Sequence, residues 1–173
     1  MRPILFVFSG LPGTGKTTLS KLISKYYHTT YFRLDSIEQG LRDLCEVNVQ
    51  GEGYRLCYRI TRDNLLLGNS VVVDCCNPIS LTRKEWDEVA KGAGASIINI
   101  EITCFDKVEH INRVSTREND IPNLALPSWN EIEKRHYEKW NDEIICIDTS
   151  KQNVDDSMKQ LIELIDINIK NFA

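Results

Sequence analysis

Residues 10–17 constrain the fold of this chain more than any other stretch. They read GLPGTGKT and fit the phosphate-binding pattern G-x-x-x-x-G-K-S/T at every specified position. At ordinary usage of glycine, lysine, serine and threonine, a random chain of this length would match roughly one time in a hundred or less. The pattern requires a strand before it and a helix after it, so it predicts local structure as well as chemistry.

The flanking segments have the required character. Residues 4–8 form a short apolar run rich in β-branched and aromatic side chains, typical of a fully buried strand. Residues 17–27 carry Leu19, Leu22 and Ile23 at helical spacing and contain no glycine or proline. Glycines let backbone N–H groups turn inward around phosphate oxygens, and the helix N-terminus adds partial positive charge. We therefore expect this loop to bind the phosphates of a nucleotide.

Two side chains of the loop have specific expected roles. The ammonium group of Lys16 would reach the β and γ phosphates of ATP, and the hydroxyl of Thr17 would bind the Mg²⁺ that bridges them. The expected nucleotide-binding residues are those of the loop and the one that follows it: Gly10, Leu11, Pro12, Gly13, Thr14, Gly15, Lys16, Thr17 and Thr18.

The rest of the chain alternates between strand and helix patterns. Further strands are predicted at residues 31–34, 70–76, 97–105 and 143–147, and helices at 36–47, 54–67, 80–93, 106–114, 129–140 and 154–169. Five strands alternating with helices predict an α/β fold with a parallel sheet covered on both faces, and ligands of such sheets bind at the carboxyl ends of the strands. With 173 residues and no linker or repeat, the chain is predicted to be one domain, residues 1–173.

Two acidic residues follow predicted strands at that sheet edge. Asp35 is placed to take the proton from an attacking hydroxyl, although an Asp there would equally serve as a helix N-cap. Asp74 follows three valines and resembles a Walker B acid, which would hold Mg²⁺ through water; the alternative is a turn-forming Asp ahead of Cys75 and Pro78.

The predicted helix that Asp106 caps runs through Val108, Ile111 and Val114 and carries two arginines. Arg113 and Arg117 are four residues apart, so on a helix they would share one face and form a lid over the phosphates. The alternative is a solvated face on which they pair with Glu109 or Glu118. Arg42, two helical turns after Asp35, is a weaker candidate for an acceptor pocket.

Histidines and tryptophans carry weaker information. His28, His110 and His136 lack metal-ligand spacing, so we expect them to be structural or exposed. Trp129 and Trp140 would lie on one predicted helix, which would pack either near an adenine or in the core.

Composition narrows the class of partner and the compartment. A net charge of −4 does not favour long nucleic acid, although a local basic groove stays possible. No apolar run approaches the ~20 residues of a membrane span, and residues 1–2 lead directly into a strand, so we expect a cytoplasmic protein without a signal peptide. The six cysteines contain no C-x-x-C pair and are expected to be reduced core thiols, with a metal site or a vicinal Cys75–Cys76 redox pair as alternatives.

These residues together resemble those of a known family, the small P-loop kinases. This family includes polynucleotide kinase 5′-domains, zeta toxins, chloramphenicol phosphotransferase and AAA-like predicted ATP-binding kinases. The matching features are GLPGTGKTTL at residues 10–19, Asp35, VVVDCCNP at residues 71–78, and the pair Arg113 and Arg117. The resemblance implies a P-loop three-layer sandwich with sheet order 2-3-1-4-5. It also implies an arginine-bearing lid, with Asp35 as base or acceptor anchor and the two arginines stabilising the transferred phosphate.

The chain departs from the family after the second strand. Members often have an arginine close after that Asp, whereas this chain has Glu38 and Gln39 and no arginine until Arg42. A phosphate-bearing acceptor would ordinarily need a basic residue near Asp35, so the sequence leaves the acceptor's charge open.

The sequence therefore favours an ATP- and Mg²⁺-dependent phosphotransferase that acts on a hydroxyl of a small molecule, nucleoside or nucleotide. One alternative is a regulatory ATP-hydrolysing protein; a GTPase is disfavoured because no Asn-Lys-x-Asp segment is present. The other alternative is a polynucleotide 5′-hydroxyl kinase or a toxin-type kinase. Acceptor specificity is expected in residues 36–60 and 118–130, and the oligomeric state is not predicted.

Overall fold

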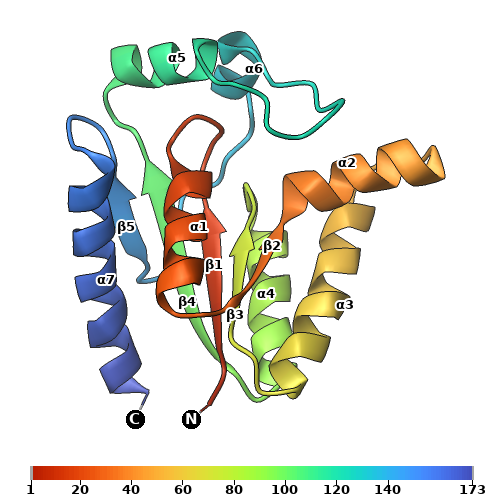
Figure 1. Cartoon of the computed structure of the whole chain (residues 1–173), viewed down its shortest axis with the longest axis vertical. Helices are drawn as coiled ribbons and strands as arrows, with labels where there is room; N and C mark the ends of the chain where they lie inside the picture. Colours follow the sequence, from red (N-terminus) through yellow and green to blue (C-terminus); the bar gives the residue numbers. More distant parts are fainter. Residues whose placement is uncertain (1, 173) are drawn as a thin grey trace.

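Residues 2–172, which the computed structural model describes, form a parallel sheet with helices on both faces (Figure 1). The strands are β1 (Ile4–Ser9), β2 (Thr30–Arg33), β3 (Val71–Asp74), β4 (Ser96–Thr103) and β5 (Ile145–Asp148). They pair in the order β2-β3-β1-β4-β5, and every pairing is parallel. The predicted α/β class and the strand order implied by the resemblance are both confirmed.

Seven helices in the described residues connect and cover the strands: α1 (Lys16–Tyr26), α2 (Leu34–Cys45), α3 (Glu52–Leu66), α4 (Ser80–Gly92), α5 (Lys107–Ser115), α6 (Trp129–Glu133) and α7 (Val154–Asn171). None of them is both long and apolar enough to cross a bilayer.

The core consists of two apolar layers, one on each face of the sheet. Successive residues of β1 point to opposite faces, because side chains alternate along a strand. Phe6 and Phe8 therefore pack with Leu19 of α1 and Leu161 of α7, whereas Leu5 and Val7 pack with residues of α3 and α4, among them Trp86. This is the predicted three-layer sandwich, with β1 at its centre.

The carboxyl edge of the sheet is covered by elements outside the sandwich. In Figure 1 both chain ends lie below the sheet, while α5 and α6 lie across the top of the strands and α2 extends to one side. The segment between α5 and α6, residues 116–128, has no helix or strand and reaches toward α2 (Figure 1). We call residues 116–128 the lid segment.

The helix predicted at residues 129–140 is the largest error in the sequence-based assignment. Only α6 forms, because backbone groups of the residues after it make hydrogen bonds to other parts of the fold. Arg83 donates to the carbonyl oxygens of Glu138 at 2.7 Å and Lys139 at 3.1 Å, and Glu138 N donates to Pro78 O at 2.8 Å. The guanidinium group of Arg83 also lies 4.0 Å from the ring centroid of Trp140, which anchors the end of this segment on α4.

Two smaller differences concern element boundaries and cysteines. β2 ends at Arg33 and α2 begins at Leu34, so Asp35 lies in the first turn of the helix and does not end the strand. The prediction of core thiols is correct for only some of the cysteines. The structure has all six as free thiols: Cys57, Cys75 and Cys104 are buried, Cys76 is half-buried, and Cys45 and Cys146 are exposed.

Candidate functional site

The loop between β1 and α1 has the conformation of a phosphate-binding loop. Gly10 and Gly13 have φ angles of +138° and +85°, a region that favours glycine. A Cβ atom on Gly10 would lie 2.3 Å from the carbonyl oxygen of Ile102, and one on Gly13 would lie 2.6 Å from Cγ2 of Val114. The loop therefore needs glycine at both positions. A side chain at residue 10 would clash with β4, and one at residue 13 would clash with α5.

His110 of α5 also holds this loop. Its Nε2 donates to the carbonyl oxygen of Pro12 at 2.8 Å, and its ring packs edge-on against Trp129, with centroids 5.0 Å apart. The expected structural role of His110 is confirmed. Trp129 thus supports the loop and does not line the cavity described below.

Lys16 and Asp74 form a buried ion pair at the carboxyl ends of β1 and β3. Asp74 accepts from Lys16 through Oδ1 and from the hydroxyl of Tyr31 through Oδ2 at 3.0 Å. Burial opposes the charge on Asp74, but Lys16, Thr17 and Tyr31 outweigh it and lower the pKa of the carboxyl. Burial likewise opposes the charge on Lys16, but Asp74 and Asp35 raise the pKa of its ammonium group. Both groups are therefore charged at neutral pH.

Thr149, just after β5, connects the phosphate-binding loop to α5. Its Oγ1 lies 2.7 Å from the carbonyl oxygen of Thr14 and 3.0 Å from that of Thr103, to either of which it can donate. The same atom accepts from Nη1 of Arg113 at 2.7 Å, and Nη2 of Arg113 donates to the Thr149 carbonyl at 2.8 Å. Three segments that are distant in sequence thus meet at one hydroxyl.

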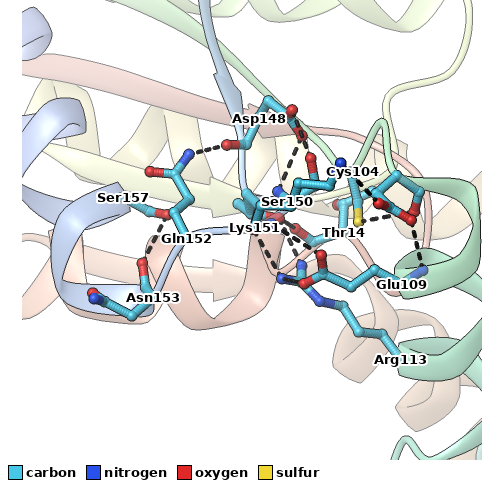
Figure 2. A network of polar contacts seen from close by, with 12 residues as sticks. Thr14, Cys104, Glu109, Arg113, Asp148, Ser150, Lys151, Gln152, Asn153 and Ser157 are labelled. Carbon is cyan, nitrogen blue, oxygen red and sulfur yellow. Dashed lines mark hydrogen bonds and ion pairs between the residues drawn. The ribbon is translucent and has the colours of Figure 1, made fainter.

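Glu109 fixes the other side of Arg113. Nη2 of Arg113 donates to Glu109 at 2.5 Å, and Glu109 accepts from Lys151 N at 2.9 Å. Figure 2 shows Arg113 reaching from α5 toward the loop that joins β5 to α7, with Glu109 beside it. The alternative of pairing with Glu109 is therefore realised, but Arg113 still faces the cavity and does not point to open solvent.

A cavity of about 550 Å³ lies above the loop. Of the predicted site residues, all except Thr14 and Asp74 line it. Thr14 is buried beneath the loop, where its hydroxyl donates to the carbonyl oxygen of Leu11 at 3.0 Å, and Asp74 reaches the cavity only through Lys16. The predicted residues on the cavity wall are Gly10, Leu11, Pro12, Gly13, Gly15, Lys16, Thr17, Thr18, Asp35, Arg113 and Arg117.

Asp35 lies on the α2 side of this cavity. The N-terminus of α2 has no side-chain cap hydrogen bond, so the alternative of Asp35 as an N-cap is not realised. Its carboxylate is 3.9 Å from Nε of Arg33 and is close to half exposed. This half-exposed carboxylate on the cavity wall is accessible to a bound hydroxyl compound.

Arg117 and Arg42 differ from the sequence-based expectation. Arg117 follows α5 and does not continue it, so Arg113 and Arg117 do not share a helix face, although both line the cavity. Arg42 pairs with Glu38 one turn back at 3.4 Å and is not on the cavity wall. The proposal of Arg42 as an acceptor contact is therefore wrong.

Sequence reasoning missed several residues of this wall. Arg33 and Lys21 line it near Asp35, Arg135 lines it beside Cys76, and Thr149 closes the opposite end. A basic residue was expected after Asp35, whereas Arg33 precedes Asp35 at the end of β2. No local pattern marks Thr149 or Arg135.

The lid segment is attached across the cavity. Asp120 accepts from Nη1 of Arg33 at 2.7 Å and from Nζ of Lys21 at 3.2 Å, and these hydrogen bonds hold its pKa well below the usual range. Nδ2 of Asn123 donates to Asp43 of α2 at 3.3 Å. The lid segment thus contacts β2, α1 and α2, on the same side of the cavity as Asp35.

No protein-family model and no curated protein matches this sequence. Among solved structures, the chain is similar to a gluconokinase from Sinorhizobium meliloti, with a TM-score of 0.71, 15% identity, and coverage of 99% of this chain and 96% of that one. The APS kinase of Mycobacterium tuberculosis in complex with AMPPNP and APS gives a TM-score of 0.68 at 16% identity, covering 95% of this chain and 98% of the other.

A third neighbour is Chaetomium thermophilum Kti12 in complex with ADP-AlF3, with a TM-score of 0.68, 18% identity, and coverage of 94% and 97%. The structural neighbours are thus small P-loop kinases, and the resemblance drawn from the sequence is confirmed at the level of the fold.

Proposed function

We propose that this chain is an ATP- and Mg²⁺-dependent kinase that transfers the γ-phosphoryl group to a hydroxyl of a small molecule, nucleoside or nucleotide. The observation that supports it most is the division of one cavity into two halves. The phosphate-binding loop, Arg113 and Thr149 line one half, and the carboxylate of Asp35 lies in the other. An acid there can take the proton of an acceptor hydroxyl, and in a hydrolase it would activate water instead, so the response of the rate to an acceptor separates the two.

In the proposed reaction, the acceptor oxygen forms a bond to the γ-phosphorus while the bond from that phosphorus to the bridging oxygen breaks, which leaves ADP. The hydroxyl proton passes to Asp35. Lys16 and Arg117 offset the negative charge of the transferred group, and Arg113 orients the nucleotide from the side of Thr149.

The donor set near Lys16 fits Mg²⁺, which prefers oxygen ligands and keeps several waters. The Thr17 hydroxyl is on the cavity wall, and Asp74 lies behind it with its carboxylate already engaged by Lys16 and Tyr31. We infer that Thr17 would bind the ion directly and Asp74 through water. The ion would neutralise phosphate charge.

The test is ATP consumption by the purified protein with Mg²⁺, first without an acceptor and then with nucleosides, sugars, amino alcohols and 5′-hydroxyl oligonucleotides. One acceptor class should raise turnover well above the basal rate. Lys16→Ala should lose the activity by loss of ATP binding, and Asp35→Asn by loss of the base while ATP still binds. Asp63→Asn, an exposed change on α3, is the matched control for charge removal.

Two other results would replace the proposal. A basal rate of at least ~1 s⁻¹ that no acceptor changes and that Asp35→Asn leaves intact would identify an ATP-hydrolysing protein. Phosphorylation of the oligonucleotide alone, weakening steeply with salt, would identify a polynucleotide kinase.

A further inference from the structure

The cavity wall carries cationic side chains beyond those assigned to the nucleotide. Three carboxylates, those of Asp35, Glu118 and Asp120, face six cations: Lys16, Lys21, Arg33, Arg113, Arg117 and Arg135. Lys16, Arg113 and Arg117 serve the proposed nucleotide half. Arg33, Lys21 and Arg135 lie toward Asp35 and Cys76, where the acceptor would bind.

Arg33 is unusual among these cations because it is buried without full hydrogen bonding. Its side chain is only 6% exposed, yet it lines the cavity. Nη1 donates to Asp120, whereas Nε has no hydrogen-bond partner in the described chain and lies 3.9 Å from Asp35. A buried guanidinium with an unused donor indicates a partner that the folded chain does not supply.

The present partner of Arg33 belongs to the lid segment and not to the sandwich. Asp120 is 49% exposed, lies outside any helix or strand, and binds Arg33 and Lys21 together. A carboxylate between an arginine and a lysine has the arrangement that a bound carboxylate, phosphate or sulfate group would adopt. A ligand anion that replaced Asp120 would itself pair with the buried guanidinium of Arg33, so the exchange would leave no buried charge without a partner.

We propose that the phosphoryl acceptor carries an oxyanion group that binds Arg33 and Lys21 in place of Asp120. This inference rests on the proposed function. The group is a carboxylate, a phosphate ester or a sulfate ester. Bound there, it places the rest of the acceptor beside Asp35. The acceptor is therefore a hydroxyl compound with its own negative charge, such as a sugar acid or a nucleotide, and not a neutral sugar or nucleoside.

The kinetic test compares acceptors in matched pairs that differ only in charge: an aldonic acid with its aldose, a nucleoside 5′-phosphate with its nucleoside, and a sulfate ester with its alcohol. The charged member of at least one pair should be the better substrate, and the pair that responds identifies the anion. Asp120→Asn should lower the KM of that acceptor about three- to fivefold, because it removes a competing carboxylate. The KM values of ATP and of neutral acceptors should not change.

Removal of the cations should act in the opposite direction. Arg33→Gln should raise the KM of the charged acceptor at least about tenfold, with little change in the KM of ATP. Because Arg33 is buried, Lys21→Gln provides a second variant at a 46%-exposed side chain, with an expected rise of about threefold. Asp43→Asn removes the charge from the acceptor of the Asn123 hydrogen bond, and so weakens another contact of the lid segment without touching Arg33 or Lys21; it should leave the KM unchanged.

Two outcomes overturn the inference while the proposed function stands: equal use of charged and neutral acceptors, or an Asp120→Asn effect that Asp43→Asn reproduces. The latter would show a loosened lid and not a vacated anion site.

If no acceptor is phosphorylated, the proposed function fails, and anion binding decides the inference separately. AMPPNP with Mg²⁺ would fill the phosphate-binding loop, and inorganic sulfate would be titrated at constant ionic strength by calorimetry. Asp120→Asn should bind sulfate about three- to fivefold more tightly than the unmodified chain, and Arg33→Gln should not bind it. Equal affinity in all three proteins would overturn the inference.

Discussion

At the residue scale, Lys16 and Asp74 stabilise the fold as well as the site. Removing one partner of a buried ion pair leaves the other charge without compensation. We therefore expect Asp74→Asn to lower the free energy of unfolding by about 3 kcal/mol at pH 7. Urea denaturation followed by circular dichroism measures this value. Asp63→Asn should change it by less than about 0.5 kcal/mol, and an equal midpoint for the two variants would contradict the prediction.

The ion pair of Lys16 and Asp74 also predicts how the free energy of unfolding depends on pH. The folded-state pKa of Asp74 is lowered from 3.8, so its stabilisation is present above that value and is lost as the pH falls through the folded pKa. The folded-state pKa of Lys16 is raised from 10.5, so its stabilisation is present below that value and is lost as the pH rises through the folded pKa. The difference between the unmodified chain and Asp74→Asn should therefore be constant over roughly pH 5–9 and shrink in acid. A difference that grows in acid would contradict this.

Thr149 gives a second prediction at this scale, because its hydroxyl joins Thr14 to Arg113. Thr149→Val keeps the shape but leaves buried polar groups without partners, so we expect a loss of about 1–3 kcal/mol in unfolding free energy. Under the proposed function, the affinity for AMPPNP should also fall, since both the loop and Arg113 lose a support. Thr149→Ser keeps the hydroxyl and should behave like the unmodified chain. A loss in Thr149→Ser together with no loss in Thr149→Val would assign the effect to the methyl group and contradict the prediction.

At the element scale, two glycines isolate the contribution of backbone conformation. Gly40 lies within α2, and Gly94 follows α4 with φ +65°; an added Cβ meets nothing within 4 Å at either position. Gly40→Ala should raise the unfolding free energy by about 0.5–1 kcal/mol, because alanine favours helix. Gly94→Ala should lower it by about 1 kcal/mol, because a side chain disfavours that φ. Parallel urea titrations test both signs, and two changes of the same sign would refute the argument.

The elements also show which structure a sequence can predict. The loop at residues 10–17 and the buried strands depend on local patterns, so they were predicted with small boundary errors. The helical pattern at residues 129–140 was equally local. There, however, Arg83, some fifty residues earlier in the chain, donates hydrogen bonds to carbonyl groups of this segment. Arg33 was not predicted as a site residue, because the cation was expected on the helix after Asp35. Arg33 instead ends β2 and lies on the cavity wall.

At the scale of the whole molecule, the sheet brings two binding regions to one edge. The proposed nucleotide half is built from β1, α1 and the loop after β5, and the proposed acceptor half from the end of β2 and the start of α2. The lid segment contacts the acceptor half through Asp120 and follows α5, which packs on the loop through Val114 and His110. The lid segment and α5 therefore link the two proposed halves of the cavity.

Substitution of two lysines of α1, Lys16 and Lys21, distinguishes the proposed nucleotide half of the cavity from the proposed acceptor half in one experiment. A ligand that binds only the folded state stabilises it by about 2.7 kcal/mol at one hundred times its Kd. AMPPNP with Mg²⁺ should give this stabilisation in the unmodified chain and lose it in Lys16→Ala, measured by urea denaturation with and without the nucleotide. Lys21→Ala should retain it, because Lys21 contacts Asp120 and not the phosphate-binding loop. Loss of the stabilisation in both variants would mean that the nucleotide occupies the acceptor half as well, and retention in both would mean that it does not bind the loop.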